Sequence, residues 1–151
     1  MREYDDILIA LRRITRAIDI QSRRLLKSTG LTTSQLLVLQ AINKLNHPTP
    51  SAIAKEVLLS QATVTTIVDR MVGHSLVTRE RGSTDRRTVT ILLTDDAREK
   101  LAQAPELLQA GFLREFRKLP DWQRNMLIAS LHHIAEMMDA SDIDASPILV
   151  T

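Results

Sequence analysis

The side chains best suited to chemistry lie between Ser60 and Thr94. Residues 60–70 combine hydroxyl, amide and guanidinium groups with apolar residues at helical spacing. A short segment after them carries four arginines: Arg79, Arg81, Arg86 and Arg87. Hydroxyls and amides hydrogen-bond to base edges in a major groove, whereas arginines suit phosphates and a narrow minor groove. These residue types in this order therefore indicate nucleic-acid binding rather than catalysis.

The first group must be carried by a helix that Ser60 caps. At 100° per residue, one side of this helix gathers Val64, Ile67, Val68 and Met71, and the other gathers Thr63, Thr66, Asp69, Arg70 and Gly73. A helix merely packed in a small domain would show the same pattern. A short helix that starts at Thr49-Pro50 and continues through SAIAKEVL precedes it. The turn Leu58-Leu59-Ser60 joins the two helices, which predicts a helix-turn-helix.

The arginines must be carried by a hairpin. Two strands are predicted over Leu76–Arg81 and Thr88–Leu93, joined by a loop over Gly82–Arg87 that is rich in turn-forming residues. Asp85 lies among the arginines, where its carboxylate could orient a neighbouring guanidinium through a bidentate pair. A helix-turn-helix followed by such a hairpin predicts a winged helix-turn-helix.

Helices are predicted on both sides of this unit. The first spans Asp5 to about Lys27 and ends before Gly30; the second begins at Thr32 or Thr33, where Thr32 and Gln35 form a capping box. Thr94 caps a long fifth helix, which Pro105 and Gly111 are expected to kink or break near Ala104, and a sixth begins at Asp121. The predicted fold class is mainly α (α+β), with a two-stranded wing and flanking helices.

The flanking helices carry apolar stripes that need a partner. Packing them against a second copy gives a symmetric dimer, whose two readers would address half-sites about 34 Å apart. We therefore predict a DNA-binding domain over residues 33–94, a dimerisation region over residues 1–32 and 95–140, and a C-terminal tail over residues 141–151.

The first helix also carries six cations: Arg12, Arg13, Arg16, Arg23, Arg24 and Lys27. Phosphates or an anionic effector could bind to them. A solvated helix face is the favoured interpretation, because charge runs usually serve solubility.

Composition bounds these expectations. The chain has 151 residues, no cysteine and a net charge of only +2, so the position of the charges matters more than their sum. Neither a disulfide nor a thiol switch is expected. There is no apolar run long enough to span a membrane and no signal-peptide pattern, so a cytoplasmic protein is expected.

Three segments resemble the MarR family of transcriptional regulators, and the resemblance extends over nearly the whole chain. DRRTVTILLT, residues 85–94, is similar to the family's wing, in which Asp, any residue and Arg lead into a strand ending in Leu-Thr. TVTTIVDRMVGHSLVTRER, residues 63–81, resembles the recognition helix and first wing strand. TTSQLLVLQAI, residues 32–42, resembles the second helix.

The resemblance implies a homodimer, a palindromic operator and usually repression. It implies that Arg87 enters the minor groove, with Arg86 beside it and Asp85 as its orienting partner. The residues implied to face the major groove or its phosphates are Ser60, Gln61, Ala62, Thr63, Thr66 and Arg70.

Many members of the family release DNA when a small, often aromatic acid binds between the dimer region and the reader. Arginine and apolar side chains of the first, second and fifth predicted helices would form its walls. No motif identifies the ligand-binding residues themselves. Neither a cofactor nor a metal is expected.

Two other classes of function are compatible with parts of the sequence. An enzyme or metal site would use His132 and Glu136, which lie four apart, but no third ligand is evident and no catalytic motif is present. A winged-helix module that binds protein without specific DNA binding is the other alternative. The arginines of the hairpin favour DNA over both.

Overall fold

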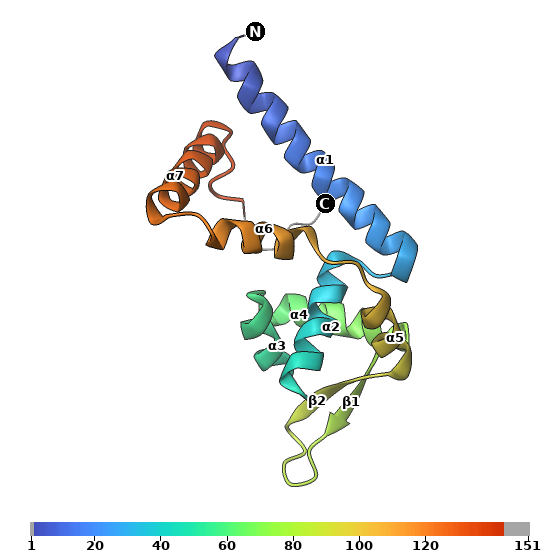
Figure 1. Ribbon diagram of the computed structural model, residues 1–151. Coiled ribbons are helices and arrows are strands. Elements are labelled where there is room, and N and C mark those ends of the chain that lie inside the picture. Colours follow the sequence, from blue (N-terminus) through green and yellow to red (C-terminus); the bar gives the residue numbers. More distant parts are fainter. Residues whose placement is uncertain (1, 144–151) are drawn as a thin grey trace. The chain divides into compact units, whose positions relative to one another are not determined.

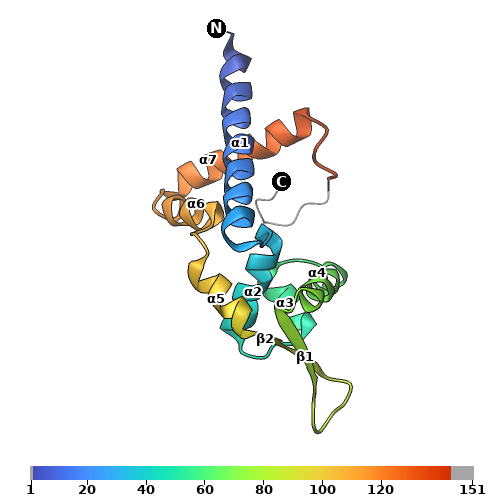
Figure 2. The ribbon, with the colours of Figure 1, turned by 90° about the vertical axis from the view of Figure 1, so that its right-hand side faces the viewer.

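The computed structural model describes residues 2–143, which form seven helices and one two-stranded sheet (Figures 1 and 2). They fall into two compact units, residues 2–105 and residues 106–143. In chain order the elements are α1 (Glu3–Thr29), α2 (Thr33–Leu45), α3 (Pro50–Val57), α4 (Gln61–Gly73), β1 (Val77–Arg81), β2 (Val89–Leu93), α5 (Asp95–Gln103), α6 (Leu108–Arg117) and α7 (Asp121–Met137). The predicted winged helix-turn-helix class is confirmed. Residues 144–151 of the predicted tail lie outside the described residues.

Side-chain hydroxyls set where four of the helices begin. Thr32, Thr49, Ser60 and Thr94 each accept a hydrogen bond from the backbone N–H three residues further on, at 3.1–3.2 Å. The predicted capping box is also present, because the Gln35 side chain accepts from the Thr32 N–H at 3.1 Å. Each such cap stabilises its helix by about 1 kcal/mol.

The core of the first unit is aliphatic. Side chains from α1, α2, α3, α4 and both strands are less than 2% exposed or close to it, including Leu25, Leu36, Leu39, Ile53, Val64, Val68, Met71, Val77 and Ile91. The predicted apolar face of α4 is thus confirmed, with Ile67 half-buried at its edge. Full burial of one such side chain is worth about 1.5–3 kcal/mol, so this face holds α4 in one rotational setting.

The hairpin is anchored to the helices at its base. Its strands pair antiparallel from Val77 opposite Leu93 to Arg81 opposite Val89, so each begins one residue later than predicted. The Ile91 N–H donates to the Pro48 carbonyl at 2.9 Å, and the Thr94 hydroxyl donates to the Ser75 carbonyl at 2.8 Å. In both views the free end of the hairpin projects from its unit, away from α2, α3 and α4 (Figures 1 and 2).

The end of α1 is tied to α5. Gly30 ends the helix in the left-handed conformation, with φ of 73°, as expected for a glycine after the last turn of a helix. The Lys100 ammonium donates to the Thr29 carbonyl at 2.7 Å, which places a cation at the negative end of α1. The helix is two residues longer at each end than the predicted Asp5–Lys27. The contacts at Thr29 and Gly30 satisfy its last turn, and at its start the Asp5 carboxylate accepts from the Arg2 N–H at 2.9 Å.

The second unit consists of α6 and α7. The expected interruption near Ala104 is a full break, because residues 104–107 separate α5 from α6 and Pro105 cannot continue a helix. An ion pair joins Glu106 and Arg114, and the hydrogen bond from Arg114 holds the pKa of the Glu106 carboxyl below its ordinary value. Phe112 and Phe116 stack with their ring centroids 5.5 Å apart. Within residues 2–143, no helix is long and apolar enough to cross a membrane.

Candidate nucleic-acid interface

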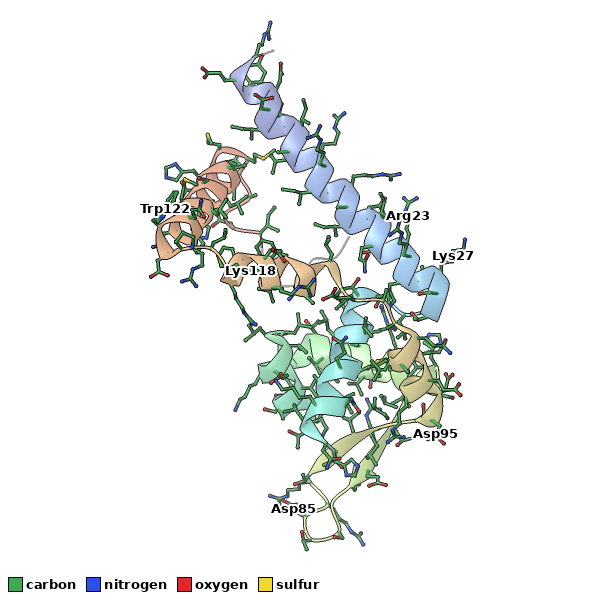
Figure 3. All side chains as sticks on the ribbon, viewed as in Figure 1. Arg23, Lys27, Asp85, Asp95, Lys118 and Trp122 are labelled. Carbon is green, nitrogen blue, oxygen red and sulfur yellow. The ribbon has the colours of Figure 1, made fainter. Side chains whose placement is uncertain are left out.

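The predicted site residues lie at the surface of the first unit. All nine are exposed: Ser60, Gln61, Ala62, Thr63, Thr66, Arg70, Asp85, Arg86 and Arg87. The first six follow α4 from its N-cap over three turns, and the other three lie in the loop between β1 and β2. Figure 3 labels Asp85 in this loop.

The hydroxyls on α4 are already engaged in local hydrogen bonds. Ser60 and Thr63 share a hydroxyl–hydroxyl bond of 2.8 Å, and Thr66 donates to the Ala62 carbonyl at 3.1 Å. Thr65, which the sequence interpretation left out, is exposed and donates to the Gln61 carbonyl at 2.9 Å. The helical spacing of Thr65, one residue after the buried Val64, already predicted that its side chain would lie off the buried face.

The hairpin loop is held by its own backbone. The Gly82 N–H donates to the Thr88 carbonyl at 2.8 Å, and the Thr88 N–H donates to the Asp85 carbonyl at 3.2 Å. A Cβ on Gly82 would lie 2.6 Å from the Asp85 carbonyl oxygen, so only glycine fits this turn without displacement. The loop is therefore a shaped turn that fixes where the neighbouring side chains leave the backbone.

Asp85 acts on the backbone rather than on a guanidinium. Its carboxylate accepts from the Arg87 N–H at 2.9 Å, and within residues 2–143 it makes no ion pair with an arginine. The expected bidentate pair is therefore wrong for this structure, because the short side chain closes a local turn two residues on. In the described part of the chain, the Arg86 and Arg87 side chains have no hydrogen-bond or ion-pair partner, so both remain open to an external anion.

An ion pair connects α4 to the wing. Arg79 on β1 pairs with Asp69 on α4, and their side chains are 41% and 58% exposed. Arg79 is therefore already paired, whereas Arg86 and Arg87 are not, although all four predicted arginines are exposed on the hairpin. A pair this exposed contributes only about 0.2–1 kcal/mol to stability.

A cavity of about 620 Å³ opens beside α4 within the first unit. It is lined by α1, by the first turn of α2 and by α4, whereas the expected walls were the first, second and fifth helices. The residues are Ser22, Arg23, Leu26, Thr32, Thr33, Ser34, Gln35, Thr63, Thr66, Ile67 and Arg70.

The lining of this cavity suits an anion with an apolar body. Its residues include Arg23 and Arg70 and no acidic residue, and the Arg23 guanidinium pairs with Asp19 at 3.1 Å. Thr33 and Ser34 open α2, so their N–H groups have no acceptor inside the helix. Thr33 is 8% exposed, and its hydroxyl has no hydrogen-bond partner among residues 2–143. Leu26 and Ile67 supply apolar surface.

The residues considered for a metal site do not form one. Across residues 2–143, no group of three or more histidine or acidic side chains is arranged to hold a metal ion. His132 and Glu136 are exposed on α7.

The sequence of the chain is similar to those of known transcriptional regulators. A sequence model of the MarR family matches residues 31–89. The HTH-type transcriptional regulator YsmB of Bacillus subtilis is 30% identical over 110 residues, covering 73% of this chain and 75% of YsmB. The HTH-type transcriptional repressor MdtR of the same organism is 24% identical over 139 residues, covering 92% of this chain and 88% of MdtR.

The fold is also similar to a solved structure. Streptococcus pneumoniae FabT, in complex with DNA, superposes with a TM-score of 0.59 at 21% identity, covering 91% of this chain and 98% of that one. At this identity the likeness concerns the fold.

The turn at Gly82 leads to a prediction about stability. Gly82→Ala should lower the free energy of unfolding by about 1 kcal/mol or more, because its Cβ meets backbone. Gly73→Ala is the matched control: no atom lies within 4 Å of its added Cβ, and alanine should stabilise α4 by up to about 1 kcal/mol. Thermal unfolding followed by circular dichroism measures both. Equal effects of the two substitutions would contradict a tight turn at Gly82.

Proposed function

The chain belongs to the MarR family of transcriptional regulators, and from this premise we propose that it is a homodimeric repressor that leaves an inverted-repeat operator when a small anionic effector binds. It is a non-enzymatic DNA-binding regulator. The observation that carries the proposal is the combination, on one unit, of an exposed polar helix face with two uncommitted arginines at the end of a rigid hairpin.

In the proposed complex, α4 is the recognition helix. Its exposed residues Ser60, Gln61, Ala62, Thr63, Thr66 and Arg70 face the major groove or its phosphates. A helix fits this groove, and residues near its N-terminus contact base edges. The buried stripe on the opposite side keeps this polar face outward.

The wing supplies the minor-groove contact. We assign Arg87 to the groove and Arg86 to a place beside it, where a narrow groove concentrates negative potential. Asp85 orients Arg87 through its backbone N–H, at 2.9 Å. The pair of Asp69 and Arg79 joins the wing to the recognition helix, in keeping with their insertion into neighbouring grooves.

Exposed apolar side chains support the homodimer. α1 exposes Tyr4, Ile7, Leu8 and Ile14, and α7 exposes Trp122, Leu127, Leu131 and Met137. Large apolar side chains in such numbers mark a protein interface. We assign residues 1–32 and 95–140 to dimerisation and residues 33–94 to DNA binding. Two-fold symmetry then implies an inverted repeat with half-sites about 34 Å apart.

The cavity beside α4 is the proposed effector site. Its cations, its unpartnered Thr33 hydroxyl and its apolar residues suit a small aromatic carboxylate. Thr63, Thr66 and Arg70 belong both to the cavity and to the proposed DNA surface. Because an occupant contacts these side chains, it weakens DNA binding, and DNA weakens its binding by the same factor.

The experiment that tests the function is selection of bound sequences from a random duplex pool at two salt concentrations. We expect an enriched inverted repeat that persists at the higher salt. Weak binding without enrichment that vanishes as salt rises would mean phosphate attraction alone. That result would replace this function with a protein-binding winged helix.

Removal of the wing arginine should weaken the complex. Arg87→Ala should reduce operator affinity about tenfold or more and lower the salt dependence by about one counterion, while the dimer remains intact. Arg98→Ala is the control, since Arg98 is an exposed arginine on α5 whose partner is Asp95, at 3.3 Å. Fluorescence anisotropy over a salt series measures affinity, and analytical ultracentrifugation measures the dimer. Wild-type affinity in Arg87→Ala would remove Arg87 from the interface.

The effector site can be tested with salicylate as the probe. Salicylate should raise the unfolding temperature of the wild type and lower its affinity for the operator. Arg23→Gln should abolish both responses, whereas Arg16→Gln should preserve them. Both arginines pair with Asp19, at 3.1 Å and 3.0 Å, but only Arg23 lines this cavity. Equal responses of the two variants would exclude the cavity as the site.

A further inference from the structure

We infer that Gln61 is the residue of α4 that determines specificity, that it reads an adenine in each half-site, and that the threonines beside it contribute methyl groups rather than hydroxyl donors. This inference rests on the proposed function, because it requires α4 to lie in a major groove. It follows from which hydrogen-bonding groups on the exposed face of α4 are already used.

The threonine hydroxyls have little left to donate. Thr65 and Thr66 each give their proton to the carbonyl four residues earlier, at 2.9 Å and 3.1 Å. The Ser60 hydroxyl accepts from the Thr63 N–H at 3.1 Å and bonds to the Thr63 hydroxyl at 2.8 Å. A base edge that needs a donor would have to break one of these bonds.

The Gln61 side chain is uncommitted. It is exposed at the first position of α4, and its amide has no hydrogen-bond partner within residues 2–143. A primary amide offers donors and an acceptor side by side. Adenine presents the complementary pair in the major groove, an N7 acceptor beside an N6 donor, and glutamine binds both at once. The first turn of a recognition helix is also where base contacts occur.

The neighbouring exposed groups are methyls. Ala62, Thr65 and Thr66 are exposed on α4, and each carries one methyl group. The C5-methyl of thymine is the apolar feature of the major groove, and alanine and threonine methyls pack against it. An adenine contact flanked by thymine contacts predicts an A·T-rich half-site.

No residue in the first turn of α4 is suited to guanine. Arginine is the usual bidentate partner of guanine, but the arginine of α4, Arg70, lies near the opposite end of the helix and lines the cavity. A phosphate contact is the remaining DNA role for a cation at that position. The first turn therefore discriminates by one amide and a set of methyl groups.

The test is sequence selection carried out in parallel with the wild-type chain, Gln61→Ala, Gln61→Glu and Thr66→Val. The wild type should require adenine at one symmetric position, with thymines next to it. Gln61→Ala should lose about 5- to 150-fold of discrimination at that position alone, the range that one bidentate base contact provides. Gln61→Glu should prefer cytosine there, because a carboxylate accepts from the cytosine amino group.

Thr66→Val separates methyl from hydroxyl contacts. Valine keeps the methyl surface and removes the hydroxyl, so the selected sequence should not change. Circular dichroism verifies that all four proteins are folded. If the wild type selects an inverted repeat but Gln61→Ala selects the same one equally well, Gln61 does not read a base and this inference fails alone. If the wild type selects no repeat, the proposed function fails and takes this inference with it.

Discussion

The arrangement of the DNA-binding surface depends on the burial of one side of α4. Val64, Val68 and Met71 are each no more than 1% exposed. Turning the helix by a single position would bring Thr65 and Asp69 toward the core and lift aliphatic groups into water, at a cost of several kcal/mol. The polar side chains that face outward therefore owe their direction to apolar neighbours that never meet a ligand. The hydroxyl of Ser60 then sets where the helix begins.

Much of the fold and of the candidate site follows from interactions between residues that are close in sequence. The threonine and serine caps, Gly30, the break at Pro105 and the hairpin loop all act within a few residues, so the sequence could predict them. Contacts that join distant residues could not be predicted. Lys100 reaches the Thr29 carbonyl across 71 positions, and Arg79 reaches Asp69 from another element. Asp85 was predicted to orient the wing, but whether its carboxylate would bind a guanidinium or a backbone N–H depends on the shape of the turn.

The exposed side chains of α4 face two different neighbours, the wing and the cavity. Asp69 faces the wing through its ion pair, whereas Thr63 and Arg70 line the cavity. Because one side of α4 is buried, another faces the wing and a third lines the cavity, a substitution at most of its positions would change one of these contacts.

The tie between Lys100 and the end of α1 also has a mechanical consequence. At 1.5 Å per residue, the 27 residues of α1 form a rod about 40 Å long that is clamped at one end. A rotation of α1 by about 5° about the end held by Lys100 would move its other end by about 3.5 Å, given a length of about 40 Å. If the free end is held in a dimer, as proposed, the displacement appears at the reader instead. On that proposal, a small rotation at Thr29 would change the separation of the two readers.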